Sequence, residues 1–338
     1  MTATIKDVAR HANVSIATVS HVLNKTRFVS EELTARVNEA IKELGFYPNL
    51  LVGSLRKKRT FTIGLVIPYI SNETFGHLAE AIQKLLFKQR YNLIICNTSY
   101  DLEIEEQAFN TLLTKKVDAM IVIPTTREAG RLQEIQDRGV PVILIDRIIP
   151  GLKVDVVRVD NVKGTYEAIK HLIDLGHRRI GYIDRHIDHS HSVDHKKGYR
   201  QALEENGIPF NMERVVRAEG FDYHAGVMAV KALLAKDPTL TAVFAYYDIM
   251  AFGAMRGAAD LGLRIPEDLS VVGCDAMPFT AVSIPRLTTI SFPIFKIARA
   301  ACDLVLERLE RSGEFKERDI VVGQRLVVRD STAAPRKE

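Results

Sequence analysis

The chain has 338 residues, of which 46% are hydrophobic and 26% are charged. These proportions are those of a globular protein, and no apolar run approaches the roughly 18 residues of a membrane-spanning helix, which excludes an integral membrane protein. The cysteines Cys96, Cys274 and Cys302 are widely spaced, form no metal-binding motif and indicate reduced thiols in the cytoplasm. We find no secretory signal, because the first residues already have the pattern of a helix.

The chain begins with a pattern of two short helices joined by a tight turn. Ser15 is a good N-cap for the second helix, because its hydroxyl can accept a hydrogen bond from a backbone N–H in the first turn. The first helix has an apolar face at Ile5, Val8, Ala9 and Ala12. The second helix would point Val19, Val22 and Leu23 inward, and Ile16, Ala17, Ser20 and His21 outward. A small, mixed outer face of this kind suits insertion into a DNA major groove.

A third helix is expected after Ser30, which caps it, and Gly45 should end it. Residues 1–46 would then form a mini-domain of three helices. Residues 1–60 contain ten Lys or Arg and five Asp or Glu residues, whereas the remainder has 36 basic and 37 acidic residues. Excess positive charge at one end favours phosphate binding there. The alternative interpretation of the three helices is a small bundle with no DNA contact.

Several motifs in this region are specific enough to name a family. They are IKDVA at 5–9, VSIATVS at 14–20, VLN at 22–24 and YPN at 47–49. Together they resemble the DNA-binding headpiece of the lactose-repressor (LacI) family, and residues 21–32 (HVLNKTRFVSEE) are most similar to its purine- and ribose-repressor branch. The similarity continues to about residue 330.

The resemblance implies a set of DNA contacts in the headpiece. They are Ser15, Ile16, Ala17, Thr18, His21, Asn24 and Arg27. Ile16 and Ala17 can offer only apolar contacts, such as those to thymine methyl groups, while His21 can donate or accept at a purine edge. Thr18, Asn24 and Arg27 would position the DNA backbone or read nearby bases.

Residues 47–60 are expected to be a linker with a short hinge helix. In the family such a helix folds on DNA and wedges a leucine into the minor groove; Leu55 matches the wedge and Arg56 follows it. Gly53 stands where the family usually has a good helix former, and should cost the hinge helix about 1 kcal/mol relative to Ala. The alternative is a flexible basic linker.

Residues 61–330 alternate between strand and helix patterns, which predicts parallel sheets covered by helices. Strand-like runs occur at 62–68, 93–96, 119–124, 140–146, 179–183, 242–246 and 269–275. No Gly-x-Gly-x-x-Gly or Walker-type loop follows them, and we expect no nucleotide cofactor. The family implies an α/β effector-binding and dimerisation domain of two lobes, similar to periplasmic binding proteins, with crossings near Asp160, Thr288 and Ile320. One lobe would comprise about 61–160 and 290–320, the other about 161–289 and 321–330, followed by a polar tail at 331–338.

Ligands of such sheets bind at the carboxyl ends of the strands, here in the cleft between the lobes. Four aspartates lie at or next to strand ends, where their carboxylates could accept hydrogen bonds from a ligand: Asp146, Asp160, Asp248 and Asp275. The alternative for each is a helix cap or a salt bridge, which is the better interpretation for Asp248. Phe75 and Phe221 match positions where the family stacks aromatic rings on the ligand, although either could be a core residue.

One loop departs from the family pattern. His195 replaces an arginine that usually contacts the ligand, and His186, His189 and His191 lie in the same loop. The cluster could indicate an effector with a different polar group and pH-dependent binding, a metal site built from His and Asp, or a solvated loop with His195 alone lining the cleft. The last of these is our interpretation, so we expect no metal.

These features predict a dimeric repressor of bacterial transcription, acting in the cytoplasm on nucleoid DNA. Its partners would be a double-stranded, pseudo-palindromic operator, a small-molecule effector such as a sugar or sugar derivative, and a second copy of the chain. The effector would shift the population between two lobe arrangements. No leucine heptad follows residue 330, so we expect no tetramer. The rivals are an enzyme that uses the cleft, for which we find no nucleophile–base set, and a ligand-sensing module that does not regulate DNA.

Overall fold

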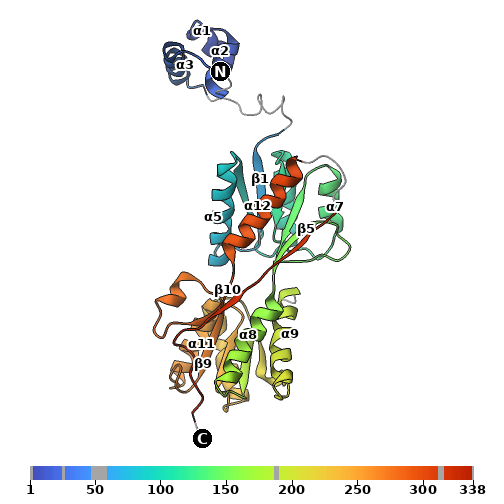
Figure 1. Ribbon diagram of the computed structural model, residues 1–338, viewed down its shortest axis with the longest axis vertical. Coiled ribbons are helices and arrows are strands. Elements are labelled where there is room, and N and C mark those ends of the chain that lie inside the picture. The colour runs from blue at the N-terminus through green and yellow to red at the C-terminus, as the bar shows by residue number, and fades with distance from the viewer. Residues whose placement is uncertain (1–2, 25–26, 47–58, 186–189, 311–315, 337–338) are drawn as a thin grey trace. The chain divides into compact units, whose positions relative to one another are not determined.

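The computed structural model describes residues 3–24, 27–46, 59–185, 190–310 and 316–336. It divides into two compact units, Met1–Thr60 and Phe61–Glu338, which are described separately (Figure 1). The expected linker contacts Leu55 and Arg56, together with Gly53, lie outside the described residues. Within the described part of the chain, no helix is both long enough and apolar enough to cross a membrane.

The N-terminal unit contains three helices, as the sequence predicts. They are α1 (Ile5–His11), α2 (Ile16–Asn24) and α3 (Glu31–Glu43). Thr4 and Asp7 form a reciprocal capping box at the start of α1. Ser15 accepts a hydrogen bond of 3.0 Å from the backbone N–H of Thr18 at the start of α2, and Ser30 caps α3. Local hydrogen bonds therefore fix where each helix begins.

A small apolar core joins the three helices. Val8, Val19 and Val37 are fully buried at its centre, one from each helix. Arg36 of α3 donates a hydrogen bond of 2.7 Å to the carbonyl of Ala12 in the turn between α1 and α2. This contact and the core hold α2 at a fixed angle, which leaves its outer face exposed.

The larger unit contains two six-stranded sheets, each with helices packed against it (Figure 1). The first sheet has the order β11-β5-β4-β3-β1-β2 and the second β12-β10-β9-β8-β6-β7. The strands of the first sheet are β1 (Thr62–Ile67), β2 (Asn92–Asn97), β3 (Ala119–Val122), β4 (Val142–Ile145), β5 (Asp155–Val159) and β11 (Asp319–Val322). Those of the second are β6 (Ile180–Arg185), β7 (Val215–Ala218), β8 (Ala242–Ala245), β9 (Ser270–Asp275), β10 (Thr288–Ser291) and β12 (Arg325–Val327).

The described strands pair in parallel except β10 with β12, which are antiparallel. The first lobe's helices are α5 (Glu73–Lys88), α6 (Leu102–Thr114), α7 (Gly130–Asp137) and α12 (Ile294–Glu310). The second lobe's are α8 (Asn161–Asp174), α9 (Ser190–Glu205), α10 (Tyr223–Lys236) and α11 (Asp248–Asp260), with 3-10 turns η1 (Met212–Arg214) and η2 (Pro278–Ala281). Figure 1 shows α12 beside α5 and α8 beside α9, and both pairs are in contact.

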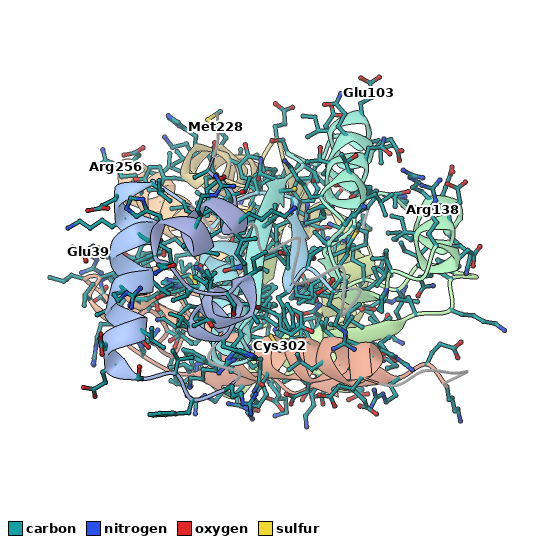
Figure 2. All side chains as sticks on the ribbon, turned by 90° about the horizontal axis from the view of Figure 1, so that it is seen from above. Glu39, Glu103, Arg138, Met228, Arg256 and Cys302 are labelled. Carbon is teal, nitrogen blue, oxygen red and sulfur yellow. The ribbon has the colours of Figure 1, made fainter. Side chains whose placement is uncertain are left out.

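Buried strands are apolar on both faces, as expected for parallel sheets between helices: every residue of β3, β4 and β8 is buried. Cys302 of α12 is buried against α5, whereas Glu103 and Arg138 point outward (Figure 2). Each lobe therefore has its own hydrophobic core and can act as a rigid body.

The chain passes between the lobes three times. The first crossing lies at Asp160, between β5 and α8, as expected. The other two come slightly later than the sequence suggested, because Thr288 lies within β10 and Ile320 within β11, and both strands complete their pairing before the chain crosses. The expected boundary at residue 330 also needs correction, since Ser331 is buried in the second lobe and donates a hydrogen bond of 2.6 Å to the carbonyl of Val271.

Candidate functional site

The outer face of α2 presents the side chains that the sequence assigned to DNA. Ile16 is 46% exposed and Ala17 is exposed, while Ser20 and His21 are partly exposed on the same helix. Thr18 faces the helix start, where its hydroxyl lies 2.8 Å from that of Ser15. Asn24 is the last residue of α2, and Arg27 is exposed just beyond it. The helix therefore offers a short apolar and polar surface at its N-terminal half.

A second candidate site is the cavity between the two lobes. It has a volume of about 30 Å³ and lies at the carboxyl ends of the strands of both sheets. It is lined by Asn72, Thr74, Phe75, Asp146, Asn161, His195, Tyr246, Tyr247, Cys274, Asp275, Phe292 and Gln324. The cavity is therefore small in the described arrangement of the lobes.

Four of the seven predicted effector contacts line this cavity: Phe75, Asp146, His195 and Asp275. Asp146 follows β4 and Asp275 ends β9, and both adopt a positive φ, at 73° and 124°. Non-glycine residues in this conformation are uncommon and cluster at functional sites. Burial raises the pKa of Asp275 well above its ordinary value, and the negative charge of Asp248 raises it further. A carboxyl in this state can accept or donate a hydrogen bond to a ligand hydroxyl.

His195 is buried, at 3% exposure, and its position is fixed from two sides. Its Nδ1 lies 2.6 Å from the hydroxyl of Thr165 on α8, and its ring meets the ring of Tyr246 edge-on at 4.8 Å between centroids. His195 thus forms a rigid part of the cavity wall on the second lobe. His186 and His189 lie outside the described residues, as does the side chain of His191; the described residues contain no cluster that could hold a metal ion.

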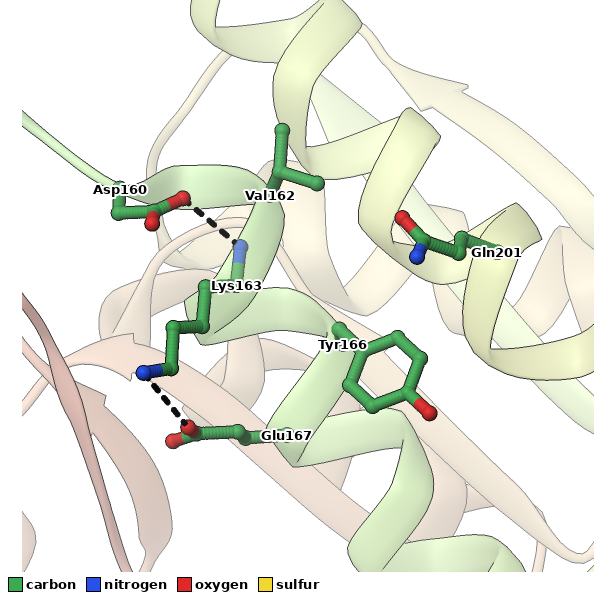
Figure 3. Close-up of a pocket in the computed structure, with 6 residues that line it drawn as sticks. All are labelled: Asp160, Val162, Lys163, Tyr166, Glu167 and Gln201. Atoms are coloured by element: carbon green, nitrogen blue, oxygen red, sulfur yellow. Dashed lines mark hydrogen bonds and ion pairs between the residues drawn. The ribbon is translucent and has the colours of Figure 1, made fainter. Parts of the chain in front are cut away.

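Asp160 does not line the cavity, contrary to our expectation. It is the N-cap of α8, and its carboxylate accepts a hydrogen bond of 3.0 Å from the backbone N–H of Lys163. Figure 3 shows Asp160 beside a separate surface depression of about 420 Å³, where Lys163 also approaches Glu167 at 4.0 Å. Its carboxylate satisfies a helix terminus, which was the alternative considered for it.

Asp248 also lies outside the cavity lining. It is buried at the start of α11, and its carboxylate accepts hydrogen bonds from the backbone N–H of Met277 at 2.9 Å and from the hydroxyl of Thr289 at 2.5 Å. Burial raises the pKa of Asp248 to about 6. The residue supports the wall that carries Asp275 and does not face the cavity.

Phe221 belongs to an aromatic cluster that links the lobes. Its ring contacts those of Tyr69 and Tyr100 in the first lobe, with centroid distances of 4.8 and 5.9 Å. These contacts place Phe221 outside the cavity lining, as a residue that holds the two lobes together.

Sequence reasoning missed several residues around the cavity. Tyr246 and Tyr247 directly follow β8, and this strand-end position could have identified them. Gln324 lies at the third crossing, and both polar atoms of its side chain are buried without a hydrogen-bond partner among the described residues. Arg147 and Arg185, each next to an aspartate at a strand end, are buried outside the cavity lining, with Arg185 5.5 Å from the ring of Tyr246, which does line it.

The chain matches two family models. Residues 4–49 match bacterial regulatory proteins of the lacI family, and residues 169–332 match the periplasmic binding protein-like domain. The transcriptional regulator DegA of Bacillus subtilis is 35% identical over 336 residues, which cover 98% of this chain and 99% of DegA. The ribose operon repressor of Haemophilus influenzae is 34% identical, covering 97% of this chain and 98% of that protein. The repressor PurR of Vibrio vulnificus is 35% identical with the same coverage.

Solved structures agree with these matches. The lac repressor dimer bound to operator and the anti-inducer ONPF superposes with a TM-score of 0.85 at 25% identity, covering 99% of this chain and 100% of that one. The complex of the regulator CelR with cellobiose gives a TM-score of 0.73 at 29% identity, covering 97% and 99%. The helical headpiece, the two-lobed unit and relatives of more than 30% identity over the whole length show that the chain belongs to the LacI family of bacterial transcriptional regulators.

Proposed function

We propose that the chain is a transcriptional repressor that binds a pseudo-palindromic operator as a homodimer. A small molecule in the interlobe cavity would raise or lower its affinity for the operator. Its relatives are DNA-binding regulators and not enzymes. The observation that carries the proposal is the exposed face of α2, held by the three-helix core on the same chain as a two-lobed unit with a cavity between its sheets. We expect it to act in the bacterial cytoplasm on nucleoid DNA.

The base contacts proposed for α2 follow from its side chains. Ile16 and Ala17 would contact thymine methyl groups, and His21 would read a purine edge. Thr18, Asn24 and Arg27 would position the DNA backbone, which fixes the register, or read nearby bases. Two headpieces related by a two-fold axis read two half-sites, which explains why the operator should be nearly palindromic. From the sequence we further propose that Leu55 inserts into the DNA minor groove, next to Arg56.

The cavity is proposed as the effector site. Asp146 and Asp275 supply acceptors for ligand hydroxyls from opposite lobes, and Phe75 supplies an apolar wall. The cavity is small, about 30 Å³, and an effector that binds one lobe arrangement more tightly than another would favour that arrangement. A ligand with such a preference shifts the equilibrium between the two arrangements and thereby the geometry of the headpiece linkers.

Selection of genomic DNA fragments by the purified protein, followed by sequencing, tests the proposal. We expect a two-fold symmetric motif of roughly 14–20 base pairs with a flexible central step. His21→Ala should relax the preference at one base pair of each half-site and leave binding to random DNA nearly unchanged. Asn38→Ala, an exposed change on α3, is the matched control and should behave like the wild type. Equal loss of operator and random binding in His21→Ala would contradict base reading.

A ligand-sensing module that does not regulate DNA is the remaining alternative. Removal of residues 1–60 separates the two, because the larger unit has its own cores. A regulator would lose DNA binding and keep its effector. A sensing module would show no operator binding in the full-length chain.

A further inference from the structure

Two arginines are buried where the lobes meet. Arg147 follows β4 in the first lobe and is 5% exposed; Arg185 ends β6 in the second lobe and is 2% exposed. They are 38 positions apart in the sequence, and only the closure of the lobes brings them to the same place. Arginine is rarely buried to this degree unless it is paired.

The hydrogen bonds of the two guanidinium groups are incomplete. Nη1 of Arg185 donates to the hydroxyl of Tyr247 at 3.1 Å, and Nη1 of Arg147 donates to the carbonyl of Pro124. Nε of both residues and Nη2 of Arg185 have no acceptor with good hydrogen-bond geometry among the residues that the structure describes, which leaves residues 186–189 aside. The hydroxyls of Tyr100 and Tyr246 lie close enough to Arg185 to act as weaker partners. Each unsatisfied buried donor costs free energy, and the cost is larger when the donor is charged.

The two cations converge on one aromatic ring. The guanidinium carbons of Arg147 and Arg185 lie 5.5 and 5.1 Å from the ring centroid of Tyr100. Arg185 also lies 5.5 Å from the ring of Tyr246, which lines the cavity. Ser99 and Tyr100 both adopt left-handed φ values, 53° and 59°, so the backbone accepts strain to hold Tyr100 there.

The two buried positive charges oppose each other, and the aromatic rings around them act in the other direction. Burial lowers the pKa of Arg147; Tyr100 opposes this shift, and the charge of Arg185 adds to it. Burial also acts to lower the pKa of Arg185, but Tyr247, Tyr246 and Tyr100 together outweigh it, so the pKa of Arg185 is raised instead. No described carboxylate forms an ion pair with either guanidinium. Cation–π contacts offset only a part of the cost of burying two positive charges. An anion that reached both guanidinium groups would accept hydrogen bonds from the remaining donors.

We propose that the effector carries an anionic group, a carboxylate or a phosphate, that Arg147 and Arg185 bind together while Asp146 and Asp275 accept hydrogen bonds from its hydroxyls. The planar fork of N–H donors in arginine matches both kinds of anion. The effector class is therefore an acidic sugar or a sugar phosphate. This inference rests on the proposed function of the cavity as the effector site.

The first experiment measures thermal unfolding of the full-length protein in sodium phosphate, sodium sulfate and sodium chloride at equal ionic strength. Phosphate or sulfate should raise the unfolding midpoint of the wild type by a few degrees relative to chloride. Arg147→Met and Arg185→Met should show a smaller difference, because methionine keeps an apolar stem without the charge and only the general stabilisation by phosphate and sulfate remains. Arg138→Met, at an exposed arginine of the first lobe, is the matched control and should keep it (Figure 2). A wild type that responds equally to all three salts contradicts the inference.

The second experiment is calorimetric titration with matched pairs of ligands, galacturonate against galactose and glucose 6-phosphate against glucose. One acidic member should bind at least about tenfold more tightly than its neutral twin, a difference of about 1.4 kcal/mol, and Arg185→Met should abolish the advantage. An advantage for galacturonate would indicate a carboxylate effector, and an advantage for glucose 6-phosphate would indicate a phosphate effector. Arg185→Lys keeps the positive charge but loses the planar set of N–H donors, and it should retain part of the affinity advantage of the acidic ligand. This variant is the control for a folding defect in Arg185→Met.

Two results would overturn the inference: a neutral sugar that binds as tightly as its acidic twin, or acid binding that is unchanged in both methionine variants. If that neutral sugar also alters operator affinity, the proposed function stands while the anion site fails. If an acid binds through the arginines without altering operator affinity, the anion site stands and the regulatory role of the cavity fails.

Discussion

The hydroxyl of Thr289 donates a hydrogen bond of 2.5 Å to Oδ1 of Asp248, which joins strand β10 to the start of α11. Oδ2 of the same carboxylate accepts the backbone N–H of Met277 at 2.9 Å, two residues after Asp275. Asp248 therefore positions the segment that carries Asp275 without lining the cavity itself. A residue with this role affects ligand binding through its neighbours.

Thr289→Val should weaken effector binding by about tenfold, because it removes one of the two hydrogen bonds that orient Asp248 and leaves a buried acceptor unsatisfied at a cost of about 1–3 kcal/mol. Thr289→Ser keeps the hydroxyl and should restore binding. Calorimetric titration of the two variants with one ligand measures the difference. Equal binding by valine and serine variants would show that the bond has no positioning role.

The stability of the protein should depend on the pair Asp248 and Asp275 as pH rises. Burial, and then the charge of Asp248, raise the pKa of Asp275 above 3.8, so the folded state holds its proton more tightly than the unfolded state. Stability from this group is complete below the unfolded pKa and is lost as pH rises through the folded pKa. Asp275→Asn removes that loss, so its free energy of unfolding relative to wild type should increase as pH rises above the pKa of an unfolded aspartate.

Chemical denaturation at several pH values measures this difference, with Asp268→Asn as a control of opposite sign. The hydrogen bond from Arg264 lowers the pKa of Asp268 to about 2, so its contribution is present above the unfolded pKa and is lost as pH falls. A constant difference between wild type and Asp275→Asn across these pH values would mean that Asp275 is ionised as readily in the folded protein as in the unfolded chain.

Arg308→Met should destabilise the first lobe strongly. Arg308 of α12 donates two hydrogen bonds to Asp155 of β5, at 2.5 and 2.7 Å, and both side chains are buried. Without Arg308, the buried carboxylate of Asp155 keeps, among the described residues, only the backbone N–H of Arg318 at 2.9 Å and its more distant guanidinium at 3.9 Å. The loss should lower the free energy of unfolding by about 3–5 kcal/mol. Arg264→Met should cost much less, because Arg264 is 57% exposed and Asp268 keeps a second partner, Arg336, at 2.6 Å. Urea unfolding measures both changes. A similar decrease in the free energy of unfolding for the two variants would contradict the prediction.

Gly53→Ala should tighten operator binding and weaken the response to effector. Alanine favours a helix by about 1 kcal/mol over glycine, and a hinge helix that folds on DNA gains this free energy only in the bound state. Gly130→Ala, where an added methyl group meets nothing within 4 Å, is the control. Operator affinity and helicity are measured by filter binding and circular dichroism. Unchanged affinity together with unchanged helicity would speak against a hinge helix.

The sequence was informative wherever the signal is local. Ser15, Ser30 and Gly45 mark the helix boundaries of the N-terminal unit, because caps and left-handed turns depend on a few adjacent residues. The buried strands were also predicted, since each is a continuous apolar run. Strands β7 and β10 to β12 were not predicted; they lie at or next to the sheet edges, where mixed polar residues weaken the pattern.

The sequence by itself determined the helical headpiece, the alternating α/β order and the strand-end positions of Asp146 and Asp275. Only the tertiary structure decided that Asp160 caps a helix, that Asp248 lies behind the cavity wall, and that Arg147 and Arg185 converge on Tyr100. The reason is physical: a cap or an apolar period is set by neighbours along the chain. The direction of a side chain and its burial against another lobe depend on residues distant in sequence, which closure of the fold brings together.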